Sequence, residues 1–289
     1  MLVMLLVAVG VLAAIATLLV VRQDSLIYFP RSYAAAELEA AQSCQALEFA
    51  TDQGSQTAFL LPPRSADSAR TLWVVFGGNA SLALHWLEFA RGCPDRHAAF
   101  LLVDYPGYGR SEGHPSPEAI RRTGRGALDR ALAHPALRSA GLRIGVLGHS
   151  LGAAAALQLA SEREVAQVVL LAPFTSMLEM ARRTVGRPLA QFLRHRFDNR
   201  ARLAEVLERF PATRVTIIHG TRDEIIPVSM GRELAASAPD RIEYLELPDA
   251  NHNSLALFHE EEIYARMLHP SMPPCLIFRM ESRFVNSRK

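Results

Sequence analysis

Three residues far apart in this sequence are of the types that activate a hydroxyl group for attack on a carbonyl carbon. Ser150, Asp223 and His252 occur in the order serine, acid, histidine. A serine hydroxyl is a weak nucleophile at neutral pH, so it needs a histidine to accept its proton and an acid to orient that histidine. Such a set of residues cleaves esters, thioesters or amides, provided that the surrounding elements bring the three side chains together.

The residues around Ser150 predict a sharp turn between a strand and a helix. The pentapeptide Gly-His-Ser-Leu-Gly occupies positions 148–152, after the apolar run 142–147 and before four consecutive alanines at 153–156. This context is that of a nucleophile elbow, in which the two glycines remove Cβ atoms that would collide at the turn. The backbone N–H of Leu151, which follows the nucleophile, is then expected to be one donor to an oxyanion.

Asp223 and His252 each follow a run of strand character. Asp223 comes shortly after the apolar run 215–218, with Glu224 beside it as an alternative acid, and His252 follows the run 242–247. The carboxyl ends of parallel strands meet at one edge of a sheet, so both residues are expected at that edge. His149 and His219 are interpreted instead as packed or locally hydrogen-bonded histidines.

A second oxyanion donor is expected from a glycine-containing loop that follows one of the first predicted strands. The sequence Gly77-Gly78-Asn79-Ala80 follows the apolar run 72–76. Hydrolases with this kind of elbow take the second donor from the loop after the third strand, where glycines let the backbone approach the substrate closely. We assign this donor to the backbone N–H of Asn79.

The order of apolar and helical segments predicts an α/β fold with a mostly parallel, doubly wound sheet. Unbroken apolar runs are typical of parallel strands that are covered on both faces. They occupy 72–76, 100–103, 142–147, 168–171 and 215–218, and a hairpin-like pair at 47–51 and 57–61 precedes them. Helical patterns alternate with the runs. The segment of about 174–210, which is helical throughout, is predicted to be a lid over the carboxyl edge.

The N-terminus predicts a single transmembrane anchor over residues 1–21, with the hydrolase domain over 22–289. Residues 1–21 contain no charged side chain and are long enough, as a helix, to span a hydrocarbon core of about 30 Å. Ala14-Ile15-Ala16 resembles a signal-peptide cleavage site, but the apolar run continues to Val21 and no basic segment precedes it. We therefore expect an uncleaved anchor and a membrane location. The side of the membrane on which the domain lies stays open. Tyr28 and Phe29 are expected to pack on the domain.

Composition excludes several other classes of protein. The net charge is +2 and no basic tract is present, so nucleic-acid binding is not expected. The three cysteines form no C-x-x-C pair, and neither a metal nor an organic cofactor is expected. Cys44 and Cys93 could form a disulfide in an oxidising compartment or remain separate thiols.

These motifs together resemble the α/β-hydrolase superfamily, and in particular its membrane-anchored Bem46 and ABHD13/ABHD17-like serine hydrolases. The resemblance extends to about Leu268 and implies that Ser150 is the nucleophile, Asp223 the orienting acid and His252 the base. It also implies that Asp104 and the loop after it are structural. Gly77 stands where the family often has a histidine. The matching segments are 26–30, 78–80, 104–113, 148–152, 173–177, 219–227 and 252–253.

The sequence and the resemblance together predict a membrane-anchored serine hydrolase that cleaves carboxylic esters or thioesters through an acyl-enzyme intermediate. Its substrate is expected to be an acyl ester, a lipid or an acylated protein. A serine aminopeptidase-type peptide hydrolase is the alternative enzyme, because it uses the same scaffold. A catalytically inactive, membrane-bound binding module is the alternative from another class. The oligomeric state and the role of the tail 270–289 stay open.

Overall fold

The computed structural model describes residues 1–65 and 68–268 and contains an eight-stranded sheet. The strand order is β1-β2-β4-β3-β5-β6-β7-β8, in which β2 pairs antiparallel with β1 and with β4 and all other pairs are parallel. The predicted α/β-hydrolase fold with a mostly parallel sheet is confirmed. The strands are β1 Gln45–Thr51, β2 Gly54–Leu61, β3 Thr71–Phe76, β4 Ala98–Val103, β5 Arg143–His149, β6 Gln167–Leu171, β7 Arg214–Gly220 and β8 Ile242–Leu247.

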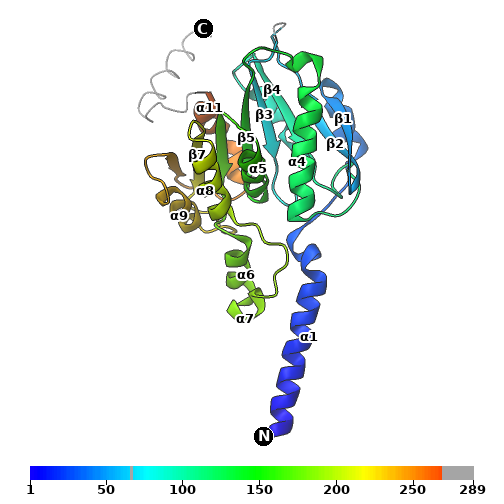
Figure 1. Cartoon of the computed structure of the whole chain (residues 1–289), viewed down its shortest axis with the longest axis vertical. Helices are drawn as coiled ribbons and strands as arrows, with labels where there is room; N and C mark the ends of the chain where they lie inside the picture. Colours follow the sequence, from blue (N-terminus) through cyan, green and yellow to red (C-terminus); the bar gives the residue numbers. More distant parts are fainter. Residues whose placement is uncertain (66–67, 269–289) are drawn as a thin grey trace.

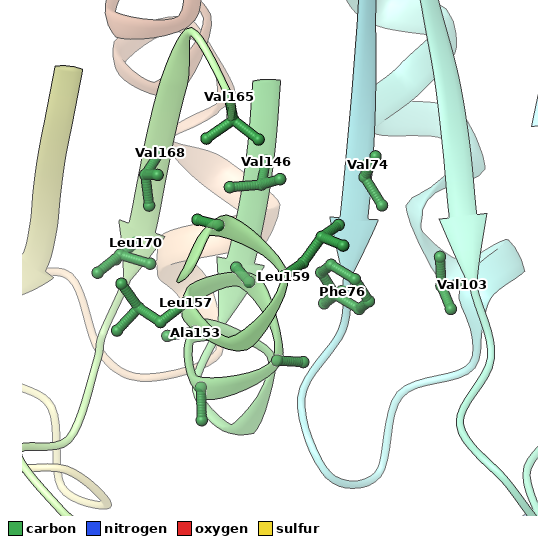
Figure 2. Close-up of a cluster of buried hydrophobic side chains, with 14 of the residues drawn as sticks. Val74, Phe76, Val103, Val146, Ala153, Leu157, Leu159, Val165, Val168 and Leu170 are labelled. Atoms are coloured by element: carbon green, nitrogen blue, oxygen red, sulfur yellow. The ribbon is translucent and has the colours of Figure 1, made fainter. Parts of the chain in front are cut away.

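Helices cover both faces of the sheet and divide the apolar interior into two clusters. On one face, α4 (Pro117–Leu132), α5 (Leu151–Glu162), α8 (Asn199–Arg209) and α9 (Val228–Ala236) contribute to one cluster, and Figure 2 shows side chains of α5 against β3, β5 and β6. On the other face, α3 (Leu87–Gly92), α10 (Ser254–Phe258) and α11 (Glu260–Leu268) contribute to the second cluster. Burial on both faces explains why the central strands are apolar without alternation.

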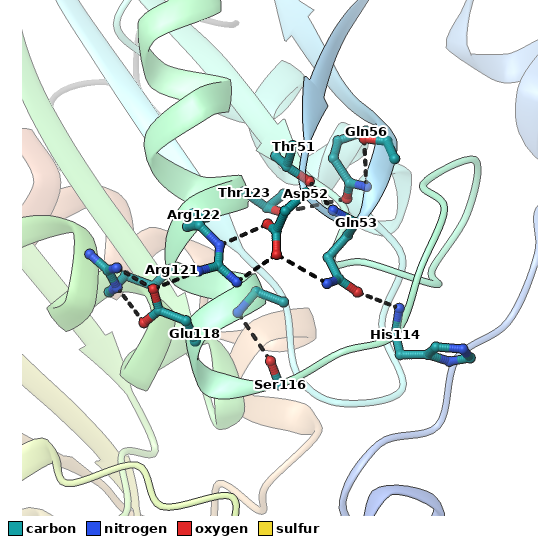
Figure 3. A network of polar contacts seen from close by, with 12 residues as sticks. Thr51, Asp52, Gln53, Gln56, His114, Ser116, Glu118, Arg121, Arg122 and Thr123 are labelled. Atoms are coloured by element: carbon teal, nitrogen blue, oxygen red, sulfur yellow. Dashed lines mark hydrogen bonds and ion pairs between the residues drawn. The ribbon is translucent and has the colours of Figure 1, made fainter.

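A polar network fixes the β1–β2 hairpin to the start of α4 (Figure 3). The guanidinium group of Arg122 contacts Asp52 in the hairpin at 2.8 Å and Glu118 one turn earlier at 2.9 Å. The Gln53 side chain accepts a hydrogen bond from the backbone N–H of His114 at 3.1 Å. Ser116 caps α4 by accepting from the N–H of Ala119, as the Ser-Pro-Glu sequence predicts. These contacts hold the α4 end of the loop that connects β4 to α4.

The N-terminal segment forms a single helix, α1, over Leu2–Ile27 and projects from the domain (Figure 1). None of the helices in the described part of the chain is long and apolar enough to cross a membrane. The transmembrane anchor predicted over residues 1–21 is therefore not supported. Helix α1 continues past residue 21 through Arg22, Gln23 and Asp24, and its last two turns contact the domain. Helices α2 (Ala35–Ala40) and η1 (Ala41–Ser43) then lead into β1.

The helical insertion between β6 and β7 has two parts with different neighbours. Helices α6 (Met177–Val185) and α7 (Arg187–Ala190) lie beyond the carboxyl edge of the sheet (Figure 1). Helix α8 instead packs beside α5, with Leu203 and Val206 fully buried in the core. The segment 174–210 thus contains three helices, with the non-helical residues 191–198 before the last one, rather than being helical throughout. That last helix belongs to the layer that covers the sheet.

Three smaller predictions have different outcomes. Tyr28 packs on the domain as predicted, with 2% of its surface exposed, whereas Phe29 is 51% exposed and its prediction was wrong. Cys44 and Cys93 are separate free thiols. Cys275 and the tail 270–289 lie outside the described residues. The remaining short helices are η2 (Ala83–Trp86) and η3 (Pro135–Leu137).

Candidate active site

Ser150 lies at the turn between β5 and α5 in a strained backbone conformation. Its φ is 57° and its ψ is −116°, a region that costs a residue with a side chain about 1–3 kcal/mol. A Cβ on Gly148 would collide with the carbonyl of Gly152, and one on Gly152 would collide with the carbonyl of Phe76. The two glycines of the pentapeptide are thus required by close backbone contacts. The turn points Ser150 away from the core at the N-terminus of a twelve-residue helix.

Asp223 and His252 come together at the carboxyl edge, from the loops after β7 and β8. The Nδ1 atom of His252 lies 2.8 Å from Oδ2 of Asp223. The other carboxylate oxygen accepts the backbone N–H groups of Ile225 at 2.9 Å and Ile226 at 2.7 Å. Because an ionised carboxylate only accepts, His252 carries its proton on Nδ1 and leaves Nε2 free to act as a base.

The charge of Asp223 is stabilised by donors on every side. Burial alone would raise the pKa of this carboxyl, but hydrogen bonds from His219 and His252 outweigh it and hold the pKa of Asp223 well below its ordinary value. His219 is fully buried, and its Nε2 lies 2.9 Å from the carbonyl of Ile226 and 3.3 Å from Oδ2 of Asp223. His219 is therefore packed and hydrogen-bonded within its own segment, as predicted. Its contact with Asp223 was not predicted, and the signal for it is the spacing of four residues between His219, at the end of β7, and Asp223 in the loop that follows.

His149 occupies the space beside His252. Its Nε2 lies 3.0 Å from the backbone carbonyl of His252, and the two rings have centroids 4.8 Å apart. Burial, with the positive potential of His252, lowers the pKa of His149 to about 4. The residue is therefore neutral at pH 7 and donates to that carbonyl. His149 is packed, which is one of the two predicted alternatives, but its hydrogen bond is not local and crosses the site from β5 to the loop after β8.

The loop after β3 approaches the elbow closely. A Cβ on Gly78 would lie 3.7 Å from the Cβ of Ser150. The carbonyl of Asn79 accepts the hydroxyl of Tyr108 at 2.5 Å, and its side-chain amide donates to the carbonyl of Ile27 at 3.0 Å. Asn79 is thus held by its own polar groups beside the serine. The N–H of Leu151, in the first turn of α5, is among those that lack a partner within the helix.

The β4–α4 loop supports the loop after β3 through hydrogen bonds, which agrees with the structural role that the resemblance implied. The hydroxyl of Tyr105 donates to the carbonyl of Gly77 at 2.5 Å, so the loop is fixed without the histidine that relatives often have there. Asp104 accepts the N–H of Ala83 at 2.8 Å and the hydroxyl of Tyr33 at 2.7 Å. Burial raises the pKa of Asp104 to about 6. This aspartate connects structural segments and does not line the pocket.

A cavity of about 640 Å³ opens above the sheet edge and contains most of the predicted site residues. Ser150, Leu151, Asn79 and His252 all line it, and Asp223 lies behind His252. Its other walls come from α1, α6, α7 and the residues after α7. None of the described residues that line it is an aspartate, glutamate, lysine or arginine. Such a cavity suits an uncharged, largely apolar ligand.

No group of three or more histidine, cysteine, aspartate or glutamate side chains could hold a metal ion within residues 1–65 and 68–268. The titratable residues at the site instead pair with one another, as the contacts of Asp223 show.

Comparison with known proteins gives relatives of the same fold. The family model for the alpha/beta hydrolase fold matches residues 73–216. The uncharacterized protein Rv2307c of Mycobacterium tuberculosis is 30% identical over 237 residues, covering 80% of this chain and 81% of the relative. An esterase of Pyrococcus furiosus, PF2001, superposes with a TM-score of 0.63 at 17% identity, covering 83% of this chain and 94% of its own. A serine hydrolase of Xanthomonas campestris, XC6422, does so with a TM-score of 0.55 at 14% identity, covering 80% of this chain and 98% of its own.

Proposed function

We propose that this chain, which belongs to the alpha/beta hydrolase superfamily, is a serine hydrolase that cleaves carboxylic esters or thioesters. The observation that carries the proposal is the contact of His252 with Asp223 at 2.8 Å, in the loop that borders the cavity of the strained Ser150. A histidine oriented by a buried carboxylate is the base that a serine nucleophile needs. The segments that resemble the Bem46-like group support an assignment to that part of the superfamily.

The proposed reaction gives each residue a defined role. Nε2 of His252 takes the proton of the Ser150 hydroxyl as the oxygen attacks the carbonyl carbon of the substrate. The N–H groups of Asn79 and Leu151 bind the oxyanion that forms. His252 then returns the proton to the departing alcohol or thiol, which leaves an acyl-enzyme. A water molecule, activated by the same histidine, releases the carboxylic acid and restores Ser150.

The cavity favours ester or thioester cleavage over aminopeptidase activity. An aminopeptidase must hold the ammonium group of its substrate, and burying an ammonium without a carboxylate partner is costly. No aspartate or glutamate is among the described residues that line this cavity. The apolar walls instead suit the acyl part of an ester.

A labelling and turnover experiment tests the proposal. The full chain is expected to react with a fluorophosphonate probe and to hydrolyse p-nitrophenyl esters or acyl-thioesters. Ser150→Ala should abolish both, whereas Ser161→Ala, at the far end of α5, should change neither. Failure of the native protein to label would favour a binding module. Activity confined to aminoacyl anilides would identify a peptide hydrolase instead.

We also propose that α1 attaches the enzyme to a lipid surface. Described apolar side chains along this helix are exposed to solvent, including Val3 at 72%, Val7 at 61% and Val11 at 53%. A continuous exposed apolar surface of this kind marks a site of interaction. Lipid is the occupant that fits, because residues 1–21 contain no charged side chain that could pair with a polar protein surface.

Flotation with phosphatidylcholine vesicles tests this attachment. The full chain is expected to rise with the vesicles, and a double variant Val7→Glu, Val11→Glu is expected to remain at the bottom of the gradient. Leu132→Glu changes an exposed leucine on α4 (37% exposed) and should float like the native chain. Flotation of the double variant, or a stable dimer that the same substitutions dissociate, would contradict the proposal.

A further inference from the structure

The C-terminal end of α1 forms one wall of the cavity that holds Ser150. Val20, Gln23, Leu26 and Ile27, from its last two turns, line the cavity. The facing wall comes from the helical insertion, with α6 residues such as Met177 and Met180. A helix outside the sheet and N-terminal to the whole hydrolase domain therefore borders the candidate nucleophile's cavity.

Polar contacts fix α1 to the insertion. The side-chain oxygen of Gln23, which is 5% exposed, accepts the backbone N–H groups of Arg194 at 2.7 Å and His195 at 3.3 Å. His195 lies between two residues at the end of α1: its Nε2 is 2.9 Å from Asp24, and its Nδ1 is 3.0 Å from the hydroxyl of Tyr28. A neutral histidine satisfies both contacts, because Nε2 donates to the carboxylate and Nδ1 accepts from the hydroxyl.

The same end of α1 is also attached to the loop that carries a proposed oxyanion donor. The carbonyl of Ile27 accepts the side-chain amide of Asn79 at 3.0 Å. The N–H of Phe29 donates to the hydroxyl of Tyr108 at 2.9 Å. The end of α1 is therefore attached to the insertion on one side of the cavity and to the Asn79 loop on the other. These contacts determine its position relative to Ser150.

The walls differ in chemistry from the floor. The floor, at the sheet edge, contains His149, Ser150, Asn79 and His252, whereas α1 and the insertion contribute aliphatic, methionine and phenylalanine side chains with few polar groups. A substrate whose ester carbonyl lies at Ser150 would thus extend its apolar part between α1 and α6. Among the lining residues of α1, Val20 lies furthest along the helix from the domain.

We propose that residues 20–27 of α1 form the wall that holds the acyl chain of the substrate and set the longest chain that the enzyme accepts. This inference rests on the proposed ester or thioester hydrolysis. It assigns the substrate class as esters of medium to long fatty acids. It also makes Val20 and its neighbours on α1 residues that determine specificity.

Neighbouring valines on α1 provide a matched pair for the test. Val20 lines the cavity, whereas Val21 is 68% exposed and does not. The measurement is kcat/KM for p-nitrophenyl acetate, butyrate, octanoate and laurate with the full chain. In Val20→Trp the ratio of laurate to acetate activity should fall about tenfold or more, the effect of a few methylenes of space in an apolar pocket. Val21→Trp should keep the native ratio.

A smaller substitution keeps the test informative if Val20→Trp does not fold, which its thermal unfolding would reveal. Val20→Ala should move the preferred chain length toward longer acids, because it widens the same wall. An unchanged chain-length profile in a folded Val20 variant, or an equal change in the Val21 variant, would overturn the inference. If the native chain hydrolyses no ester or thioester and does not label with a fluorophosphonate, the proposed function itself fails, which is a distinguishable result.

Discussion

The floor and the walls of the cavity are held in place in different ways. The floor is built at the ends of β3, β5, β7 and β8, where backbone contacts such as those of Gly148 and Gly152 leave no room for other residues. The walls of α1, α6 and α7 lie outside the sheet, and a few side-chain contacts through Gln23 and His195 join them. The difference suggests that the floor determines the chemistry and that the walls determine which substrate is accepted.

The comparison makes a distinction that kinetics can measure. A change in the floor should reduce the rate for every substrate by the same factor, because it alters the transition state at the carbonyl carbon. A change in the walls should alter the rate according to the length of the acyl chain. The predictions below test that distinction, beginning with the largest expected effect.

Replacement of Asp223 by Asn should have the largest effect. The substitution keeps the size of the side chain but removes the charge that fixes the proton on Nδ1 of His252, so kcat should fall about 10⁴-fold, as in other enzymes with this arrangement. Initial rates with acetate and laurate esters should fall by equal factors. Asp249→Asn, at an exposed aspartate near the site, is the control and should retain native rates. Unequal losses with the two esters would break the distinction between floor and walls.

Much of the floor could be predicted from sequence, because each part follows from a local pattern. The apolar runs gave the central strands, and the Gly-His-Ser-Leu-Gly turn gave the elbow between β5 and α5. Asp223 and His252 could be placed because both follow strands in a parallel sheet. Their contact brings together two residues that are each defined by their own strand.

The walls could not be predicted, because they depend on contacts between segments distant in sequence. The apolar composition of residues 1–21 indicated a membrane span, and nothing local to that segment shows that residues 20–27 pack on the insertion. Gln23 accepts hydrogen bonds from residues 194 and 195, which are 171 and 172 positions away in the sequence. The helical pattern of 174–210 likewise did not show that α8 covers the sheet while α6 and α7 line the cavity.

The next largest effect is on stability in acid and concerns His149 in the floor. Its pKa is lowered from 6.5 to about 4 by burial, so the unfolded chain takes up a proton that the folded chain refuses between these values. The stabilisation is complete above pH 6.5 and is lost as the pH falls toward 4, by about 2 kcal/mol between pH 7.5 and pH 5. Asp104, whose pKa burial raises to about 6, contributes in the opposite direction over this range, so the His149 contribution is measured as the difference between urea unfolding of the native chain and of His149→Gln at the two pH values.

His149→Gln and His195→Gln compare the floor with the walls in the same experiment. The first variant removes the titrating group and keeps a donor for the carbonyl of His252, so its stability should depend less on pH. Burial also lowers the pKa of His195, but the attraction of Asp24 opposes that shift, so the second variant should lose a smaller part of the pH dependence. A larger change for His195→Gln would mean that the walls contribute more to acid stability than the floor.

Gln23→Ala should have the smallest effect and should be specific to long substrates. The substitution leaves the N–H groups of Arg194 and His195 without their acceptor, which loosens the attachment of α1 to the insertion. Loss of such a hydrogen bond costs about 1 kcal/mol, so the ratio of laurate to acetate kcat/KM should fall about fivefold. Gln23→Glu keeps an acceptor and should restore most of the ratio, while Arg22→Ala, at an exposed position one residue earlier, should leave it unchanged. If acetate and laurate rates fall together in Gln23→Ala, α1 acts through Asn79 on the oxyanion rather than on the acyl chain, and the floor and walls are one unit.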